Sequence, residues 1–170
     1  MIKRLVKLGL CITMMAVLVA CTNKAEFKKE SITATKLQEK LDNKDSFFLM
    51  IERENCGFCE AIEDYIEETK DENPGYTIYS LDSTDFDFKR DDEKDMTLES
   101  GTADGKILLD MAPYFLYTPT IYVIKDGKAI LAGIGFDHTT GEISVWDTES
   151  TIDFEKAKSQ NLWDFLKENQ

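Results

Sequence analysis

The sequence contains few residues that could hold a structural zinc ion, with four cysteines and one histidine, His138, among its 170 residues. A structural zinc site needs four Cys or His ligands, commonly two pairs at short spacing. Two of the cysteines, Cys11 and Cys21, lie in an N-terminal segment with a separate explanation. One remaining cysteine pair and one histidine are too few for such a site, so we expect no bound metal.

Basic residues are also scarce, since 20 Lys and Arg stand against 33 Asp and Glu and give a net charge of −13. A nucleic-acid surface needs a basic patch, and the lysines form no such cluster. Anionic lipid head groups would repel a chain of this charge. Nucleic acid is therefore excluded as a partner, and any membrane association must be covalent or apolar.

The one extended apolar run, Leu8 to Ala20, follows a basic start and is too short for a comfortable membrane span. We interpret residues 1–20 as a signal peptide. The run ends in Leu-Val-Ala-Cys, which resembles the lipobox of bacterial lipoproteins. This resemblance implies that Cys21 is acylated and begins the mature chain, with residues 21–30 as a lipidated tether and residues 31–170 as the domain. A plain secretory peptide or an uncleaved anchor is the alternative.

The Cys56-Gly57-Phe58-Cys59 motif lies where a strand pattern changes to a helix pattern. The apolar run Ser46 to Glu52 predicts a buried strand, and apolar residues at helical spacing follow the motif. Free N–H groups and the positive dipole end at a helix start favour a thiolate on Cys56, while Cys59 is placed to attack a mixed disulfide. The motif therefore predicts a reversible disulfide, with a structural or incidental cysteine pair as the alternative.

Other segments predict further elements. A helix is expected after Thr35, whose spacing to Gln38 fits a capping box. The remaining expectations are strands at 76–81 and 121–125, a helix at 106–115 interrupted or bent at Pro113, a hairpin turn at Asp126-Gly127, a short strand within 141–146 and a terminal helix containing Leu162, Phe165 and Leu166.

Two stretches have no clear pattern. Residues 82–99 are strongly acidic and are expected to form a solvated loop or a frayed helix. A calcium loop is disfavoured there because the ordered ligand spacing and turn glycine are missing, whereas selection of basic substrates is an alternative role. Most of residues 136–158 cannot be assigned.

The order of these elements, together with Thr118-Pro119-Thr120 before a strand, resembles the thioredoxin superfamily over residues 31–169. The resemblance implies an α/β, thioredoxin-like fold with a central mixed sheet flanked by helices, and with acidic and C-terminal insertions. The signal segment and the insertions make the chain similar to thioredoxin-like lipoproteins of Gram-positive bacteria, including bacteriocin transport accessory proteins.

The resemblance also implies residue roles. Cys56 would be the attacking thiolate and Cys59 the resolving thiol. Pro119 would be a cis-proline that keeps the site open and prevents metal capture, and the backbone of Thr118 would pair with an extended substrate. Gly57 and Phe58 are assigned to substrate binding as well.

One position departs from the family. Thioredoxins bury an acid six residues before the first cysteine, where this chain has Met50. Glu52 lies two residues further along the same face of the strand and is a candidate proton acceptor.

Carboxylates surround the motif in sequence, at Glu52, Glu54, Glu60, Glu63 and Asp64, and Arg53 is the only basic residue close by. Because these charges raise the energy of a thiolate, we expect a reducing or isomerase-like couple. The predicted function is an extracytoplasmic, membrane-anchored thiol-disulfide oxidoreductase that needs no cofactor. Its partners would be cysteine-containing exported proteins or peptides and a membrane redox partner. The alternative is a non-catalytic binding module or accessory protein for peptide (bacteriocin) export.

Overall fold

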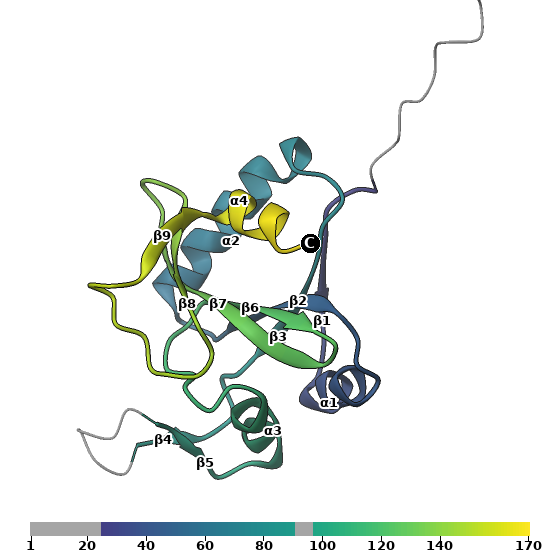
Figure 1. Cartoon of the computed structure of the whole chain (residues 1–170), viewed down its shortest axis with the longest axis vertical. Helices are drawn as coiled ribbons and strands as arrows, with labels where there is room; N and C mark the ends of the chain where they lie inside the picture. Colours follow the sequence, from purple (N-terminus) through teal and green to yellow (C-terminus); the bar gives the residue numbers. More distant parts are fainter. Residues whose placement is uncertain (1–24, 91–96) are drawn as a thin grey trace, which may run out of the picture.

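A computed structural model describes residues 25–90 and 97–170. The expectations for the signal peptide, Cys11 and Cys21 lie outside these residues. Figure 1 shows a central twisted sheet with helices against both of its faces. Within the described residues no helix is long and apolar enough to cross a membrane.

The central sheet has seven strands in the order β1-β3-β2-β6-β7-β8-β9. The strands β1, β3 and β2 are parallel, and each later neighbour is antiparallel, so the sheet is mixed as expected. The strand bounds are Lys28–Ser31 (β1), Phe47–Glu52 (β2), Thr77–Asp82 (β3), Thr120–Lys125 (β6), Lys128–Asp137 (β7), Glu142–Trp146 (β8) and Lys158–Asn161 (β9).

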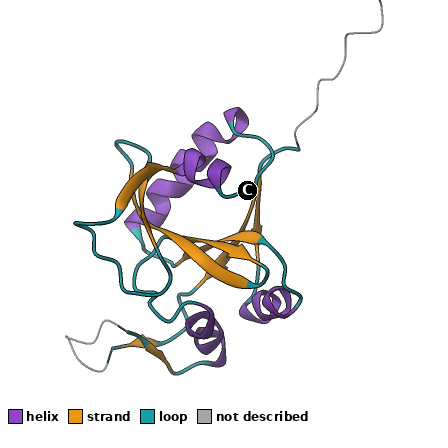
Figure 2. Ribbon diagram, viewed as in Figure 1, coloured by secondary structure: helices purple, strands orange, loops and turns teal. Residues whose placement is uncertain are grey.

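The helices divide between the two faces of the sheet, as Figure 2 shows, because residues of each strand alternate between the faces. On β2, Leu49 and Ile51 pack on one face with helices α1 and α3, whereas Phe48 and Met50 pack on the other face with α2 and α4. The helix bounds are Ala34–Asp42 (α1), Gly57–Thr69 (α2), Ala103–Met111 (α3) and Leu162–Glu168 (α4), with a 3-10 turn η1 at Lys70–Glu72. The same alternation directs Glu52 toward the α2 face.

Two predicted helix starts were wrong. The cap of α1 is Thr33, whose hydroxyl accepts the N–H of Lys36, so the proposed capping box at Thr35 does not form. The cap of α3 is Thr102, which accepts the N–H of Gly105, and the helix ends at Met111, before Pro113, where an interruption or a bend was expected.

Strand β1 begins at Lys28, inside the stretch that we expected to be a tether. It pairs in parallel with β3, from Lys28 opposite Thr77 to Ser31 opposite Ser80. The sheet therefore starts before residue 31.

The acidic segment is neither the loop nor the frayed helix that we expected in its described parts. Strand β4, Phe88–Lys89, pairs with β5, Glu99–Ser100, as a small antiparallel sheet. The ring of Phe88 lies 5.5 Å from that of Phe115, which ties this sheet to the core. Packing of two aromatic residues, Phe86 and Phe88, thus allows this segment to form a sheet despite its acidic composition.

The C-terminal part of the chain contributes two further strands. The predicted strand at 141–146 is confirmed as β8, and the turn at Asp126-Gly127 is confirmed by φ values of 50° and 74°. Strand β9 was not predicted, since Lys-Ser-Gln-Asn has no apolar alternation. Residues 147–157 leave and re-enter the sheet at the neighbouring strands β8 and β9.

Candidate redox site

Cys56 and Cys59 form a disulfide at the start of α2, with their Cα atoms 5.2 Å apart. Asn55 takes a left-handed conformation, φ 53°, which asparagine tolerates better than most residues, and it turns the chain from β2 into the helix. Cys56 then occupies the N-cap, where its Sγ lies 3.2 Å from the N–H donor of Cys59. A thiolate formed at Cys56 would therefore accept a backbone N–H at the positive end of a helix.

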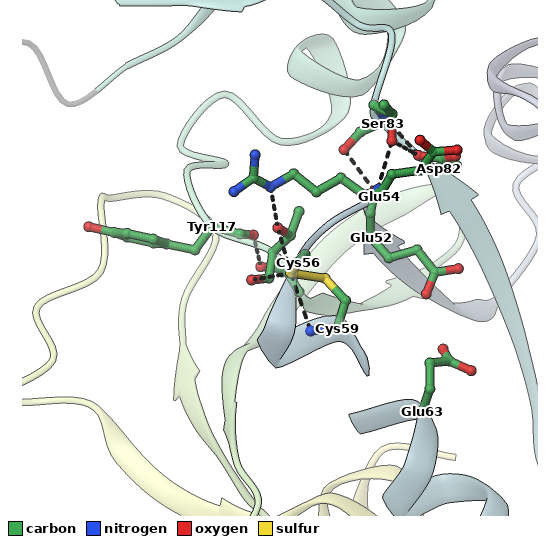
Figure 3. Close-up of a disulfide and its surroundings, with 12 residues drawn as sticks. Glu52, Glu54, Cys56, Cys59, Glu63, Asp82, Ser83 and Tyr117 are labelled. Carbon is green, nitrogen blue, oxygen red and sulfur yellow. Dashed lines mark hydrogen bonds between the residues drawn. A yellow bond between two sulfur atoms is a disulfide. The ribbon is translucent and has the colours of Figure 1, made fainter. Parts of the chain in front are cut away.

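The Thr118-Pro119 loop lies directly against this disulfide, and Figure 3 shows the disulfide with its surroundings. The peptide bond between these residues is cis, which confirms the isomer implied by the family resemblance. The carbonyl oxygen and the hydroxyl oxygen of Thr118 lie 3.5 Å and 3.4 Å from Cys56 Sγ. Both cysteines are almost wholly buried, with exposed fractions of 6 % for Cys56 and 4 % for Cys59.

Arg53 was not predicted to take part in the site, but it completes a short hydrogen-bond chain. Its Nε donates to the hydroxyl of Thr118 over 3.3 Å. Because a guanidinium can only donate, the Thr118 oxygen accepts from it and keeps its own hydrogen for Cys56 Sγ. A hydrogen bond donated by this hydroxyl favours the thiolate form of Cys56, whereas the Thr118 carbonyl oxygen, 3.5 Å from Cys56 Sγ, opposes it.

A second set of polar residues, the charged cluster, consists of Lys29, Glu52, Glu63 and Ser80. Lys29 Nζ lies 3.0 Å and 3.1 Å from the two carboxylate oxygens of Glu52 and also donates to Glu63. The hydroxyl of Ser80 donates to Glu52. The Glu52 side chain is only about 20 % exposed, and these partners hold its carboxylate in place and compensate for its burial.

The charged cluster lies on the Cys59 side of the disulfide, where Figure 3 shows the Glu52 and Glu63 carboxylates. Burial raises the pKa of Glu63 above its ordinary value; Lys29 opposes this increase, and the neighbouring Glu52 adds a smaller one. The cluster therefore contains a carboxyl group that is protonated more readily than a solvated glutamate.

The structure brings together Cys56, Cys59, Thr118 and Pro119 as the resemblance implied. It places Glu52 on the Cys59 side, and its role as proton acceptor remains a prediction. Phe58, in the first turn of α2, is 64 % exposed.

Lys29 and Ser80 were not predicted from the sequence to take part in the charged cluster, and Glu63 was named only as one of the carboxylates close to the motif. Glu63 lies four residues after Cys59 and hence on the same face of α2, a spacing that could have identified it. Lys29 had no such signal, because its contact with Glu52 spans 23 positions.

The topology decides the fold. Strands β1-β3-β2-β6-β7 carry the redox motif between β2 and α2 and the cis-proline immediately before β6, which is the arrangement implied by the family resemblance. The fold is thioredoxin-like. Strands β8 and β9 extend this thioredoxin-like sheet, and the β4–β5 sheet is inserted between β3 and α3.

Comparisons with known proteins do not add a function for this chain. No protein-family model matches the sequence, and no curated protein matches it. Among solved structures, the chain is similar to one described as ferredoxin:thioredoxin reductase and thioredoxin f2 complex, at 14 % identity and a TM-score of 0.44, over 65 % of this chain and 86 % of that chain. It is also similar to thioredoxin O2 from Arabidopsis thaliana in the oxidized state, at 18 % identity and a TM-score of 0.40, over 65 % and 85 %.

Among the described residues, no group of three or more His, Cys, Asp or Glu side chains is arranged to hold a metal ion.

Proposed function

We propose that this protein is a thiol-disulfide oxidoreductase that acts on cysteines of exported proteins or peptides. The observation that carries the proposal is the Cys56–Cys59 disulfide at a helix start, in contact with the cis Thr118-Pro119 loop. A disulfide that only stiffened the fold would not need a thiolate-stabilising cap, a hydroxyl donor and a guanidinium around one of its sulfurs.

The reaction follows from the two positions. In the reduced protein the Cys56 thiolate attacks a substrate disulfide, forms a mixed disulfide and releases one substrate thiolate. The Cys59 thiolate then attacks Cys56 Sγ, releases the second substrate thiolate and leaves the Cys56–Cys59 disulfide. The substrate gains two electrons, and a dithiol reductant restores the protein.

Glu52 is proposed as the group that accepts the proton of Cys59 before this second attack. A general base must reach the thiol directly or through one water molecule, and the Glu52 carboxylate lies on the Cys59 side of the disulfide (Figure 3). Lys29 and Ser80 hold the carboxylate there. Glu52 also lies on the same face of β2 as Met50, the position at which thioredoxins carry their buried acid.

The cellular location is part of the proposal. The Leu18-Val19-Ala20-Cys21 sequence supports lipidation of Cys21 and attachment to the outer face of a bacterial cell membrane. Disulfides persist outside the cytoplasm, which suits a protein that exchanges them. A membrane redox partner would supply electrons there.

The direction of electron flow depends on a balance of charges around Cys56. Lys29 pairs with two of the carboxylates on which the expected reducing character rested. Arg53, through Thr118, adds a contact that favours the thiolate. The reduction potential measures this balance, and we expect it between the thioredoxin and disulfide-isomerase values of about −270 and −180 mV.

The experiment is equilibration of the purified full-length protein with glutathione or dithiothreitol buffers, with the Cys56–Cys59 state read by thiol alkylation and mass. A potential near about −120 mV would make the protein a disulfide donor and contradict the proposed direction. A pair that does not exchange with either buffer would contradict the proposed enzyme and favour a binding module. A Cys56→Ser variant separates the enzyme from the binding module, because an enzyme would lose its biological effect and a binding module would keep it.

A further inference from the structure

A cavity of about 470 Å³ opens beside the redox site. Phe58 and Thr118, which flank Cys56, form one end of it. The rest of its wall comes from the cis-proline loop, the bulged part of β7, strands β8 and β9, and Phe154 from residues 147–157. The C-terminal extension of the sheet therefore supplies five of the twelve residues that line this cavity.

The cavity gathers exposed aromatic side chains. Of the five large apolar residues exposed in the described part of the chain, Phe58, Tyr117 and Phe154 line this cavity. The rings of Tyr117 and Phe154 meet edge to face, 5.4 Å apart, although Phe154 is 52 % exposed. Single exposed apolar residues are common on protein surfaces, but a group of them around one cavity indicates a binding surface.

The bulge in β7 links the cavity to the cis-proline loop. Gly135, at φ 68°, donates its N–H to the carbonyl of Pro119 over 2.8 Å. The register shift between Ile134 and Asp137 places both residues in the cavity wall. A substrate chain that pairs with the backbone of Thr118 would thus continue into the cavity.

The polar part of the wall is acidic. Asp137 and Glu142 both line the cavity, and no Lys or Arg is found among its lining residues. The N–H of Thr139 donates to Asp137 and is the main cause that lowers the pKa of this carboxyl group. The Glu142 carboxylate accepts the hydroxyl of Ser159 over 2.8 Å. Both positions favour a cationic ligand at neutral pH.

We propose that this cavity binds the segment flanking the cysteine of a polypeptide substrate and selects an aromatic or large aliphatic side chain together with a Lys or Arg. The inference rests on the proposed oxidoreductase function and names its substrate class. An extended chain advances about 3.3 Å per residue, so the selected side chains lie within about three residues of the cysteine. Phe154 and Tyr117 bind the apolar side chain, and Asp137 and Glu142 bind the basic one.

The test uses peptides whose single cysteine is joined to 2-nitro-5-thiobenzoate. Attack by Cys56 forms the protein–peptide disulfide and releases the coloured thiolate, which gives the rate. With the reduced full-length protein, a peptide with Phe and Arg beside the cysteine should react about 10-fold faster than one with Ala and Glu. Phe154→Ala should reduce the Phe-over-Ala preference to within about 2-fold.

Matched variants separate the two contacts. Ile130→Ala removes an exposed apolar side chain that does not line the cavity, and it should leave the preference unchanged. Asp137→Asn and Glu142→Gln keep the hydrogen-bond acceptors but lose the charges, so they should abolish the Arg-over-Glu preference, whereas Glu149→Gln should not. An unaltered peptide preference in Phe154→Ala and in the two amide variants would overturn the inference.

Two readouts keep this result distinct from the proposed enzyme activity. The rate with bis(2-hydroxyethyl) disulfide, which is small, uncharged and has no flanking residues, reports exchange alone, and it should be the same in the wild type and in the two control variants, Ile130→Ala and Glu149→Gln. Binding of peptides with Ser in place of Cys to the oxidised protein, followed by fluorescence anisotropy, reports the cavity alone. Absent exchange would overturn the proposed function only, and equal binding of the Phe-Arg and Ala-Glu peptides would overturn the inference.

Discussion

The two sides of the disulfide differ in polarity and in exposure. On the Cys56 side lie the cavity with its exposed aromatic rings and the Arg53–Thr118 hydrogen-bond chain. On the Cys59 side lies the partly buried charged cluster around Lys29. In the proposed mechanism, this difference separates recognition of the substrate, at the sulfur that attacks, from proton handling, at the sulfur that resolves.

The largest effect is expected from Cys59→Ser, which removes the Cys59 side of the reaction and leaves the Cys56 side complete. Turnover should fall by at least about 10³-fold, because the mixed disulfide cannot be resolved. Intact mass spectrometry should show one substrate peptide joined to each protein chain. Cys56→Ser is the control and should form no adduct; an adduct there would contradict the assigned roles.

Glu52→Gln tests whether the Cys59 side handles a proton. The resolving step should slow about 10²-fold at pH 7, while formation of the mixed disulfide changes little. The deficit should narrow as the pH rises, because hydroxide then deprotonates Cys59 without help. Stopped-flow measurements from pH 6 to 9 check this, with Glu54→Gln as the matched control. A deficit that stays constant with pH would indicate a structural role.

Lys29→Met tests whether the charged cluster also stabilises the fold. Two partly buried carboxylates would lose their cation, so the free energy of unfolding should fall by about 2 kcal/mol at pH 7. Lys29 opposes the increase in the pKa of Glu63, so its loss raises that pKa further, and the difference should shrink as the pH falls and Glu63 becomes protonated. Urea denaturation measures it. Lys36→Met removes an exposed ion pair with Glu39 and should cost no more than about 0.5 kcal/mol.

Thr118→Val tests the hydrogen-bond chain on the Cys56 side. Without the hydroxyl, less Cys56 is present as thiolate at pH 7, and mixed-disulfide formation should slow about 10-fold. Absorbance at 240 nm reports the thiolate. Thr118→Ser should retain most of the rate and Arg53→Met should lose part of it. If Thr118→Val reacts at the wild-type rate, the hydrogen-bond chain from Arg53 through Thr118 to Cys56 has no role in the mechanism.

The smallest effect is expected from Glu63→Gln. The pKa of Glu63 is raised by folding above its ordinary value of 4.5, so the folded state binds more protons between the two values. Stability of the wild type therefore falls as the pH rises through that window and is level above it. Glu63→Gln has no carboxyl group to titrate at this position. Its free energy of unfolding relative to that of the wild type should therefore increase from pH 4 to 7. Solvent screening limits the gain to under about 1 kcal/mol. A relative stability that is independent of pH would contradict the raised pKa.

The parts of the fold that could be predicted are those that have a signal in the local sequence. The apolar strand at Phe47–Glu52 leads into Cys56 at the helix start, and the Asp126-Gly127 turn joins two apolar strands. Each of these signals lies within a few neighbouring residues. The cis-proline loop was identified through its resemblance to a family, since the sequence alone does not fix the isomer.

The parts that could not be predicted depend on contacts between distant residues. Arg53 meets Thr118 across 65 positions, and Lys29 meets Glu63 across 34. Strand β9 has no apolar alternation, because its pairing with β8 and not burial of a face defines it. Phe154 lies in a stretch with no periodicity, so its place beside Tyr117 emerges only when the chain is folded.

The attachment of residues 147–157 to adjacent strands has an evolutionary consequence. A segment whose ends are held side by side can change in length and sequence while the sheet that carries it keeps its register. Phe154, from this segment, reaches the cavity, whereas the cysteines and Pro119 belong to the rigid core. Related chains could therefore acquire new substrates by exchanging this one loop, and a graft of eleven or so foreign residues here would be a direct route to a retargeted enzyme.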